Sequence, residues 1–192
     1  EVKQIAIKIL DILVYLHSIS PPVIHRDIKP SNVLLSDRSG NHVGDVHLID
    51  FGSVQTAAVK EFGTRTVVGT YGYMPMEQFG DRTVPASDIY SLGATLIYLV
   101  TGTHPADLPV RDGRIRFEDL TNLSPEFTRW LKATTEPILE TRIKSAREAL
   151  IALQQPKLDI NSVSNSFSQI IRGDWDWNGK NWIPKNQHFL VN

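Results

Sequence analysis

Two short motifs constrain this sequence more than any other feature. Residues 25–32 read His-Arg-Asp-Ile-Lys-Pro-Ser-Asn, and residues 49–52 read Ile-Asp-Phe-Gly. The carboxylate of Asp27 can accept a proton from an attacking hydroxyl group. Asn32 and Asp50 supply oxygen atoms, which hard cations such as Mg²⁺ prefer as ligands. The spacing predicts a fold that brings both motifs together around a hydroxyl group and a metal-bound phosphate.

Composition narrows the class of protein. The chain has 192 residues, of which 41% are hydrophobic and 21% charged, as in an ordinary globular domain with a sizeable core. Its formal charge of -1 gives no electrostatic reason to bind nucleic acid or an anionic membrane. The absence of cysteine excludes disulfides and thiolate metal sites and fits an intracellular protein. The longest apolar run, 89–100, is shorter than the roughly 20 residues that span a bilayer.

Apolar residues recur at helical spacing in several segments. Pro21 ends the first of them, and the third opens with Ser124 as its N-cap and Pro125 at the first helical position. Residues 103–123 are expected to be loop-like, with at most a short helix. The helices are expected at 1–19, at 86–100, from 124 onward and at 143–153.

A β-hairpin is expected between the first two helices. Residues 33–35 and 46–49 have the character of short strands, because a polar segment with two glycines separates them. This hairpin would place Asp27 and Asn32 on a loop before its first strand, and Asp50 just after its second strand. Polar groups on loops that a scaffold braces are a common arrangement of functional sites.

The motifs, taken together, resemble the signature of eukaryotic-type Ser/Thr protein kinases, which reads H-R-D-L-x-x-x-N, then D-F-G, then A-P-E. Here Ile28 replaces the Leu, and the last element reads Pro75-Met76-Glu77. The segment 69–78 resembles bacterial kinases, in particular cyanobacterial ones. The resemblance implies a mainly α fold, α+β overall. It would be the C-terminal lobe of a protein kinase, with a small β-hairpin bearing the catalytic loop.

The resemblance also implies a reaction, the transfer of the ATP γ-phosphate to Ser or Thr hydroxyls of protein substrates. Asp27 would be the catalytic base, and Lys29 would contact the ATP phosphates and neutralise charge there. Asn32 and Asp50 would hold Mg²⁺, or Mn²⁺, and through it the ATP. Thr70 matches the family Thr that contacts the catalytic Asp and Lys.

Regulation is implied by the residue before Asp27. In kinases with an Arg at the position of Arg26, that side chain can bind a phosphate on the activation segment. Thr64 and Thr66 are the candidate phosphorylation sites. An equally weighted alternative is that these Thr only make a loop more soluble.

Five further residues match structural positions of the family. His25 would brace the catalytic loop, and Phe51 would set the position of the metal-binding Asp. Glu77 and Arg142 would form a buried ion pair. Asp88 would accept hydrogen bonds from the catalytic-loop backbone, although a carboxylate at a helix start is equally compatible with a cap.

The domain organisation follows from these assignments. Residues 1–156 would form the C-terminal lobe, with the catalytic loop at 25–32 and the activation segment at 50–77. Residues 157–192 would form a linker and a Trp-rich extension. The sequence contains neither a G-x-G-x-x-G loop nor a Val-Ala-Ile-Lys-like strand, which in kinases belong to the N-terminal lobe.

We therefore expect a kinase fragment that lacks its N-terminal lobe. The chain begins inside a helical pattern rather than with Met, which supports this expectation. The fragment alone should be inactive, and apolar surface near Leu34 and Ile49 should be exposed where the missing lobe of the same chain would pack. The kinase domain is expected in the cytoplasm, with any membrane anchor outside this segment.

Two alternatives remain at this point. A non-catalytic pseudokinase that serves as a binding scaffold is disfavoured by the intact set of catalytic residues. A small-molecule phosphotransferase is disfavoured by Thr70 and Glu77, which belong to parts that accommodate a peptide substrate.

Overall fold

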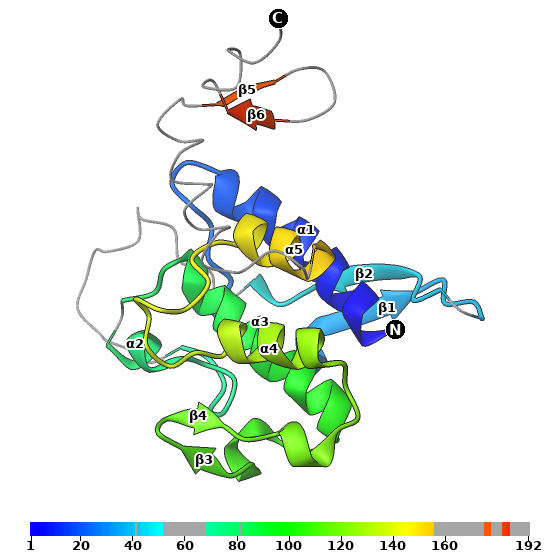
Figure 1. Cartoon of the computed structure of the whole chain (residues 1–192), viewed down its shortest axis with the longest axis vertical. Helices are drawn as coiled ribbons and strands as arrows, with labels where there is room; N and C mark the ends of the chain where they lie inside the picture. Colours follow the sequence, from blue (N-terminus) through cyan, green and yellow to red (C-terminus); the bar gives the residue numbers. More distant parts are fainter. Residues whose placement is uncertain (41, 52–67, 81, 156–174, 178–181, 185–192) are drawn as a thin grey trace, which may run out of the picture.

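The structure is a computed structural model that describes residues 1–40, 42–51, 68–80, 82–155, 175–177 and 182–184. Its α-helices are α1 (Val2–Ser18), α2 (Met76–Phe79), α3 (Pro85–Thr101), α4 (Pro125–Thr134) and α5 (Ala146–Gln154). One-turn 3₁₀ helices lie at Pro30–Asn32, Pro105–Asp107 and Glu118–Leu120. The strands are β1 (Val33–Ser36), β2 (Asp45–Leu48), β3 (Val110–Arg111), β4 (Arg114–Ile115), β5 (Trp175–Trp177) and β6 (Trp182–Pro184). Figure 1 shows that helices dominate the chain.

Each strand pairs with its neighbour in sequence. The pairs β1–β2, β3–β4 and β5–β6 each form a separate antiparallel sheet of two strands. A helical chain with small antiparallel sheets is therefore confirmed. None of the helices in the described ranges is long and apolar enough to cross a membrane.

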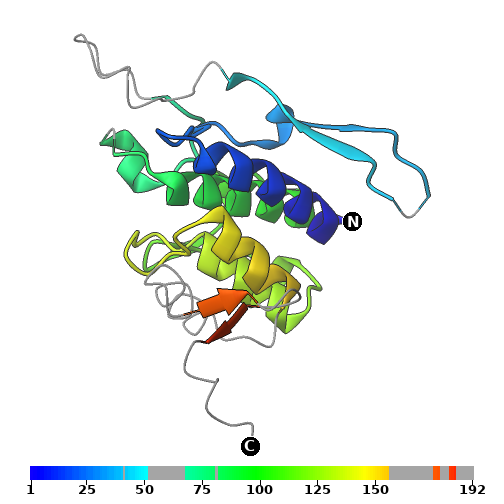
Figure 2. The ribbon, with the colours of Figure 1, turned by 90° about the horizontal axis from the view of Figure 1, so that it is seen from above.

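The elements form layers around one apolar core. Figure 2 shows the β1–β2 hairpin on one side, α1 and α3 in the middle, and α4 and α5 on the other side. Helix α1 packs against both α3 and α5 because its apolar stripe is wide enough to face two neighbours. The fully buried side chains of this core include Ile9, Leu10, Leu13, Ile28, Ile89, Leu92, Leu96 and Leu131.

Two contacts fix how α4 sits in the core. A Cβ atom at Gly93 of α3 would lie 2.4 Å from Thr134 Oγ1, so only glycine permits this close approach of α3 and α4. One turn earlier on α4, the indole Nε1 of Trp130 donates a hydrogen bond of 2.9 Å to the carbonyl oxygen of Ala149 in α5. The loop from α4 to α5 contacts α3 through Arg142, whose Nη1 donates to the carbonyl oxygen of Ala86 at 3.2 Å.

The helix predictions are confirmed, apart from one boundary. Ser124 Oγ accepts a hydrogen bond of 3.3 Å from Phe127 N and caps α4, as the sequence indicates. The expected helix start at 143 is wrong, because Ser145 Oγ accepts from Glu148 N and starts α5 at Ala146.

The sequence analysis does not predict the one-turn helix α2, the β3–β4 hairpin or the β5–β6 hairpin. The β3–β4 hairpin lies within 103–123, a segment expected to hold a loop and at most a short helix. Most of the segment 53–74, and most of 157–192, lie outside the described residues.

The outer face of the β1–β2 hairpin exposes apolar side chains. Leu34 is 49% exposed, Ile49 38% and Phe51 44%. The prediction that Leu34 and Ile49 are exposed is therefore confirmed.

Candidate active site

The β1–β2 hairpin brings the two sequence motifs together. Its register pairs Val33 with Leu48, and beyond that pair Ile49 N donates a hydrogen bond of 2.9 Å to the carbonyl oxygen of Asn32. Asn32, just before β1, and Asp50, just after β2, therefore lie at the same end of the hairpin. This is the arrangement that the sequence predicts for these two residues.

Asp27 lies at the centre of a closed group of polar side chains. Thr70 Oγ1 donates a hydrogen bond of 2.6 Å to Asp27 Oδ1. Lys29 Nζ lies 2.8 Å from Asp27 Oδ2 and donates to Thr70 Oγ1, also at 2.8 Å. Asn32 Nδ2 donates to the carbonyl oxygen of Asp27 at 2.8 Å and to its Oδ2 at 3.2 Å. The carboxylate is thus fixed in position by Lys29 and Asn32 of the first motif and by Thr70.

These contacts decide the protonation state of Asp27. Burial raises the pKa of its carboxyl, but hydrogen bonds from Lys29, Thr70 and Asn32 and the charge of Lys29 outweigh burial, so the pKa lies below its usual value of 3.8. Asp27 is therefore an anion at neutral pH, able to accept a proton. Because its pKa is low, it accepts one efficiently only from a hydroxyl that is becoming acidic during reaction.

The backbone before Asp27 is held by Asp88, which is fully buried at the start of α3. Its Oδ2 accepts from His25 N and its Oδ1 from Arg26 N, each at 2.9 Å. His17 Nε2, on α1, lies 2.9 Å from the same Oδ2. Arg26 has φ of 69°, a left-handed conformation that costs a non-glycine residue roughly 1–2 kcal/mol. The Asp88 carboxylate helps to hold this strained residue.

His25 connects the two motifs from the inside. Its ring is fully buried, and Asp27 N donates to its Nδ1 at 3.3 Å. Its Nε2 therefore carries the proton and donates to the carbonyl oxygen of Ile49 at 3.1 Å. The ring of Phe51 meets it edge-on, with the centroids 4.9 Å apart. His25 thus contacts the residues on both sides of Asp50, Ile49 through its backbone and Phe51 through its ring.

Asn32 and Asp50 offer oxygen atoms of the type that hard cations bind. Because Asn32 donates through Nδ2 to Asp27, the carbonyl oxygen of its amide is the atom left to serve a cation. Asp50 is exposed and has φ of 64° at the end of the hairpin. The described residues contain no cluster of three or more His, Asp or Glu side chains that could hold a metal by themselves. The pair itself supplies two oxygen ligands of the kind that Mg²⁺ takes.

Glu77 and Arg142 form the expected ion pair. Arg142 donates to Glu77 Oε1 at 2.6 Å and to Oε2 at 3.2 Å, with its side chain fully buried. Ser87 Oγ donates a third hydrogen bond of 2.9 Å to Glu77 Oε1, and the guanidinium lies 5.0 Å from the ring centroid of Tyr90. Backbone carbonyls of residues 86, 136 and 137 accept the remaining donors of Arg142. The pair joins α2 to α3 and to the α4–α5 loop.

The sequence can now be compared with known families. The sequence model of the protein kinase domain matches residues 1–172. The chain belongs to the protein kinase family. The match covers every residue of the kinase-like site described above.

Relatives of this chain come from cyanobacteria and plants. Serine/threonine-protein kinase PknA of Nostoc sp. is 41% identical over 162 residues, which are 80% of this chain and 28% of that protein. Serine/threonine-protein kinase B of Synechocystis sp. is 37% identical over 166 residues, 81% of this chain and 28% of that protein. Wall-associated receptor kinase-like 5 of Arabidopsis thaliana is 36% identical over 145 residues, 73% of this chain and 18% of that protein. The predicted likeness to cyanobacterial Ser/Thr kinases is confirmed. The chain spans about a quarter of the length of the two cyanobacterial relatives.

Some predicted and some unexpected residues complete this description. Thr64 and Thr66 lie outside the described residues, so their role in regulation stays a prediction. The polar residues that contact the site and were not predicted include His17, Gln78 and Thr95, whose Oγ1 donates to the carbonyl oxygen of Ile28 at 3.1 Å. Their sequence neighbours give no signal of these contacts, because each acts on a distant part of the chain.

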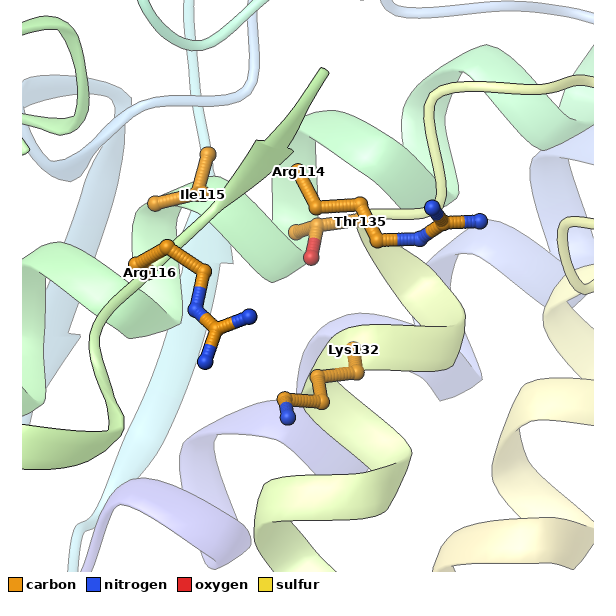
Figure 3. Close-up of a pocket in the computed structure, with 5 residues that line it drawn as sticks. All are labelled: Arg114, Ile115, Arg116, Lys132 and Thr135. Carbon is orange, nitrogen blue, oxygen red and sulfur yellow. The ribbon is translucent and has the colours of Figure 1, made fainter. Parts of the chain in front are cut away.

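A separate hollow of about 270 Å³ lies between β4 and α4 (Figure 3), lined by Arg114, Ile115, Arg116, Lys132 and Thr135. Its cations are paired with carboxylates. Arg114 donates to Glu136 at 2.9 and 3.0 Å, while Arg116 and Lys132 both contact Glu118. An anion entering this hollow would have to displace these carboxylates.

Acid should destabilise the fold through Glu77 and Asp27. Burial raises the pKa of Glu77, but its contacts with Arg142 and Ser87 outweigh burial and lower it below the usual 4.5. Both carboxyls have lower pKa values in the folded protein than in the unfolded chain. Their contribution to stability is therefore complete at pH values above the unfolded-state pKa, and it is lost as the pH falls through the folded-state pKa. We expect the unfolding free energy, measured by urea denaturation, to be level from about pH 7 to 5 and to fall steeply below about pH 4.5.

The variant Glu77→Gln provides the control for this pH dependence. It should start from a lower stability at pH 7 and show a shallower decline in acid, because one of the two carboxyls no longer titrates. An unchanged slope below pH 4.5 would contradict the part assigned to Glu77.

Proposed function

We propose that this protein is a Ser/Thr protein kinase that transfers the γ-phosphate of ATP to Ser or Thr hydroxyls of protein substrates in the cytoplasm. Residues 1–156 form its C-terminal lobe, and 157–192 form a linker and extension. The observation that carries the proposal is the closed group of Asp27, Lys29 and Thr70, with separations of 2.6 to 2.8 Å. It places a carboxylate next to an ammonium group. The carboxylate can accept the proton of a substrate hydroxyl, and the ammonium can neutralise charge on a phosphoryl group.

Each residue of the group has a proposed role. Asp27 orients the substrate hydroxyl and accepts its proton as the oxygen begins to bond to phosphorus. Lys29 neutralises charge that develops on the transferred phosphoryl group. Thr70 holds both side chains in register and sets the position of the peptide substrate. Positioning and charge neutralisation of this kind provide most of the catalysis in phosphoryl transfer.

Asn32 and Asp50 are proposed to hold Mg²⁺, or Mn²⁺, together with the ATP phosphates. The cation, when bound, neutralises the phosphates during transfer. Support comes from the amide of Asn32, whose Nδ2 is committed to Asp27, and from the carboxylate of Asp50 at the same end of the hairpin. ATP also needs contacts with a Gly-rich loop and a strand Lys, which these 192 residues lack. We therefore expect the isolated chain to be inactive, with an N-terminal lobe covering Leu34 and Ile49.

Regulation is proposed to act through Arg26. A phosphate on Thr64 or Thr66 would pair with its guanidinium and fix the activation segment, residues 50–77, in its active position. This proposal follows from the position of Arg26 immediately before Asp27.

The proposed function is tested on the full-length protein that contains this chain, together with an N-terminal lobe. We expect phosphate from MgATP to appear on Ser and Thr, but not on Tyr, of a peptide library, as read by mass spectrometry. Asp50→Asn should lower this activity by at least roughly 100-fold, because it removes charge from the metal site. Asp45→Asn, at an exposed carboxylate on β2, is the matched control and should retain activity.

Another result would favour the scaffold alternative. If the full-length protein binds MgATP but transfers no phosphate to any peptide, the phosphotransfer proposal is wrong.

A further inference from the structure

Gln78 of α2 lies directly after the activation segment and contacts the backbone of both that segment and the catalytic loop. Its side chain is buried, with 4% exposed. Its Nε2 donates to the carbonyl oxygen of Val68 and to that of Arg26, each at 2.6 Å. Val68 lies two residues before Thr70, and Arg26 lies directly before Asp27. One amide group therefore links the backbone segment that carries Thr70 to the segment that carries Asp27. Thr70 and Asp27 are hydrogen-bonded to each other in the site.

The contact completes the support of the strained residue Arg26. Asp88 accepts from its N–H on one side, and Gln78 donates to its carbonyl oxygen on the other. Both backbone groups of a residue in the left-handed conformation are thus held by buried side chains, one from α3 and one from α2. Such a conformation persists only where its surroundings over-determine it.

The orientation of the Gln78 amide is fixed by its partners. Nε2 faces two carbonyl oxygens, and exchanging the amide oxygen into its place would set three acceptors against one another. The amide oxygen is buried and has no hydrogen-bond partner among the described residues. An unpaired buried acceptor is unfavourable. The two hydrogen bonds that Nε2 donates must therefore be what holds the side chain in this position.

Gly69 shows how closely this amide is enclosed. It has φ of 125°, and a Cβ atom there would lie 2.3 Å from Gln78 Nε2 and 3.1 Å from the carbonyl oxygen of Arg26. A larger residue would displace Nε2 from the two carbonyls. Gly69 therefore permits the approach of Val68, the amide and the catalytic loop.

We propose that Gln78 is a positioning residue for phosphoryl transfer, which sets Thr70 against Asp27 and Lys29 by tying Val68 to Arg26. The inference rests on the proposed kinase function. It concerns alignment alone, because Gln78 reaches the site only through the backbone of the two segments. The loss of this tie should therefore change kcat and leave the binding of ATP almost unchanged.

The test compares Gln78→Met with the wild type in the full-length protein. Met has nearly the same size and apolar stem but cannot donate. We expect kcat to fall by about 10- to 100-fold, because small misplacements of reacting groups cost up to about 100-fold. The KM for ATP should stay within about twofold, which separates alignment from ground-state binding. Gln4→Met, at an exposed glutamine on α1, is the matched control and should leave both constants unchanged.

A second readout does not depend on activity. Hydrogen exchange, followed by mass spectrometry, should become faster in peptides covering 68–70 and 25–27 of Gln78→Met, and should stay unchanged in α5. If the wild type is inactive, the proposed function is wrong. If hydrogen exchange in Gln78→Met is unchanged, the inferred link between Val68 and Arg26 is wrong as well. If the wild type is active, a folded Gln78→Met with wild-type kcat overturns the inference.

Gly69→Ala tests the same tie from the other side. Its Cβ should push Nε2 away and lower kcat by a similar factor, with KM for ATP again unchanged. In the double variant with Gln78→Met the two losses should not add, because both remove the same contact. Full additivity, or wild-type kcat in Gly69→Ala, would overturn the inference even if Gln78→Met does not fold.

Discussion

Replacing Asp27 with Asn should lower kcat of the active kinase by about 10²- to 10⁴-fold, the range that a positioned proton acceptor contributes. The amide has the same size as the carboxylate, and its oxygen can still accept from Thr70 Oγ1. It cannot accept the substrate proton, and it leaves the ammonium of Lys29 without its anionic partner. Steady-state kinetics with a Ser peptide measure the effect.

Two observations should accompany this loss. The KM for ATP should change little, because the side chain of Asp27 acts on the acceptor hydroxyl. Asp11→Asn, at an exposed carboxylate on α1, should behave like the wild type. If Asp27→Asn keeps more than about a tenth of the wild-type kcat, Asp27 is not the proton acceptor.

Local sequence signals predict those parts of the fold that local interactions determine. Helix α1 follows from its apolar spacing, and α4 from Ser124 and Pro125, because caps and periodicity act within a few residues. The start of α5 was misplaced although Ser145 and Glu148 have the spacing of a capping box. The sequence-based prediction starts the helix at Ile143, two residues before that cap.

The β3–β4 hairpin was missed for a different reason. Its strands have two residues each, too short for an alternating pattern. The signal available was the Asp112-Gly113 pair, whose φ values of 52° and 75° are those of a tight hairpin turn. A turn signal without flanking strands is weak on its own, so the segment was predicted as a loop.

The candidate site divides in the same way. Asp27, Lys29 and Asn32 lie in one motif, so their proximity follows from the sequence. Gln78 and His17 act on backbone or side-chain groups that are 52 and 71 residues away in the chain. Whether a polar residue is buried there depends on how α1, α2 and α3 pack, which no local pattern specifies. Such residues become visible only in the three-dimensional structure.

Replacing Arg142 with Leu should lower the unfolding free energy by about 3–5 kcal/mol, because it leaves the carboxylate of Glu77 buried without its counter-charge. For a domain of this size the loss corresponds to a fall in Tm of roughly 10 °C. Chemical denaturation and calorimetry measure both quantities. The side chains of this pair are 0% and 10% exposed, so solvent cannot replace the lost partner.

The pair Arg114–Glu136 provides a control with similar geometry and more solvent. It is also bidentate, at 2.9 and 3.0 Å, but the side chain of Arg114 is 48% exposed. Arg114→Leu should therefore cost at most about 1 kcal/mol. If the two variants lose equal stability, burial is not the cause. Adding Glu77→Leu to Arg142→Leu should recover part of the loss, because the cost lies in the unpaired charge rather than in the missing contact.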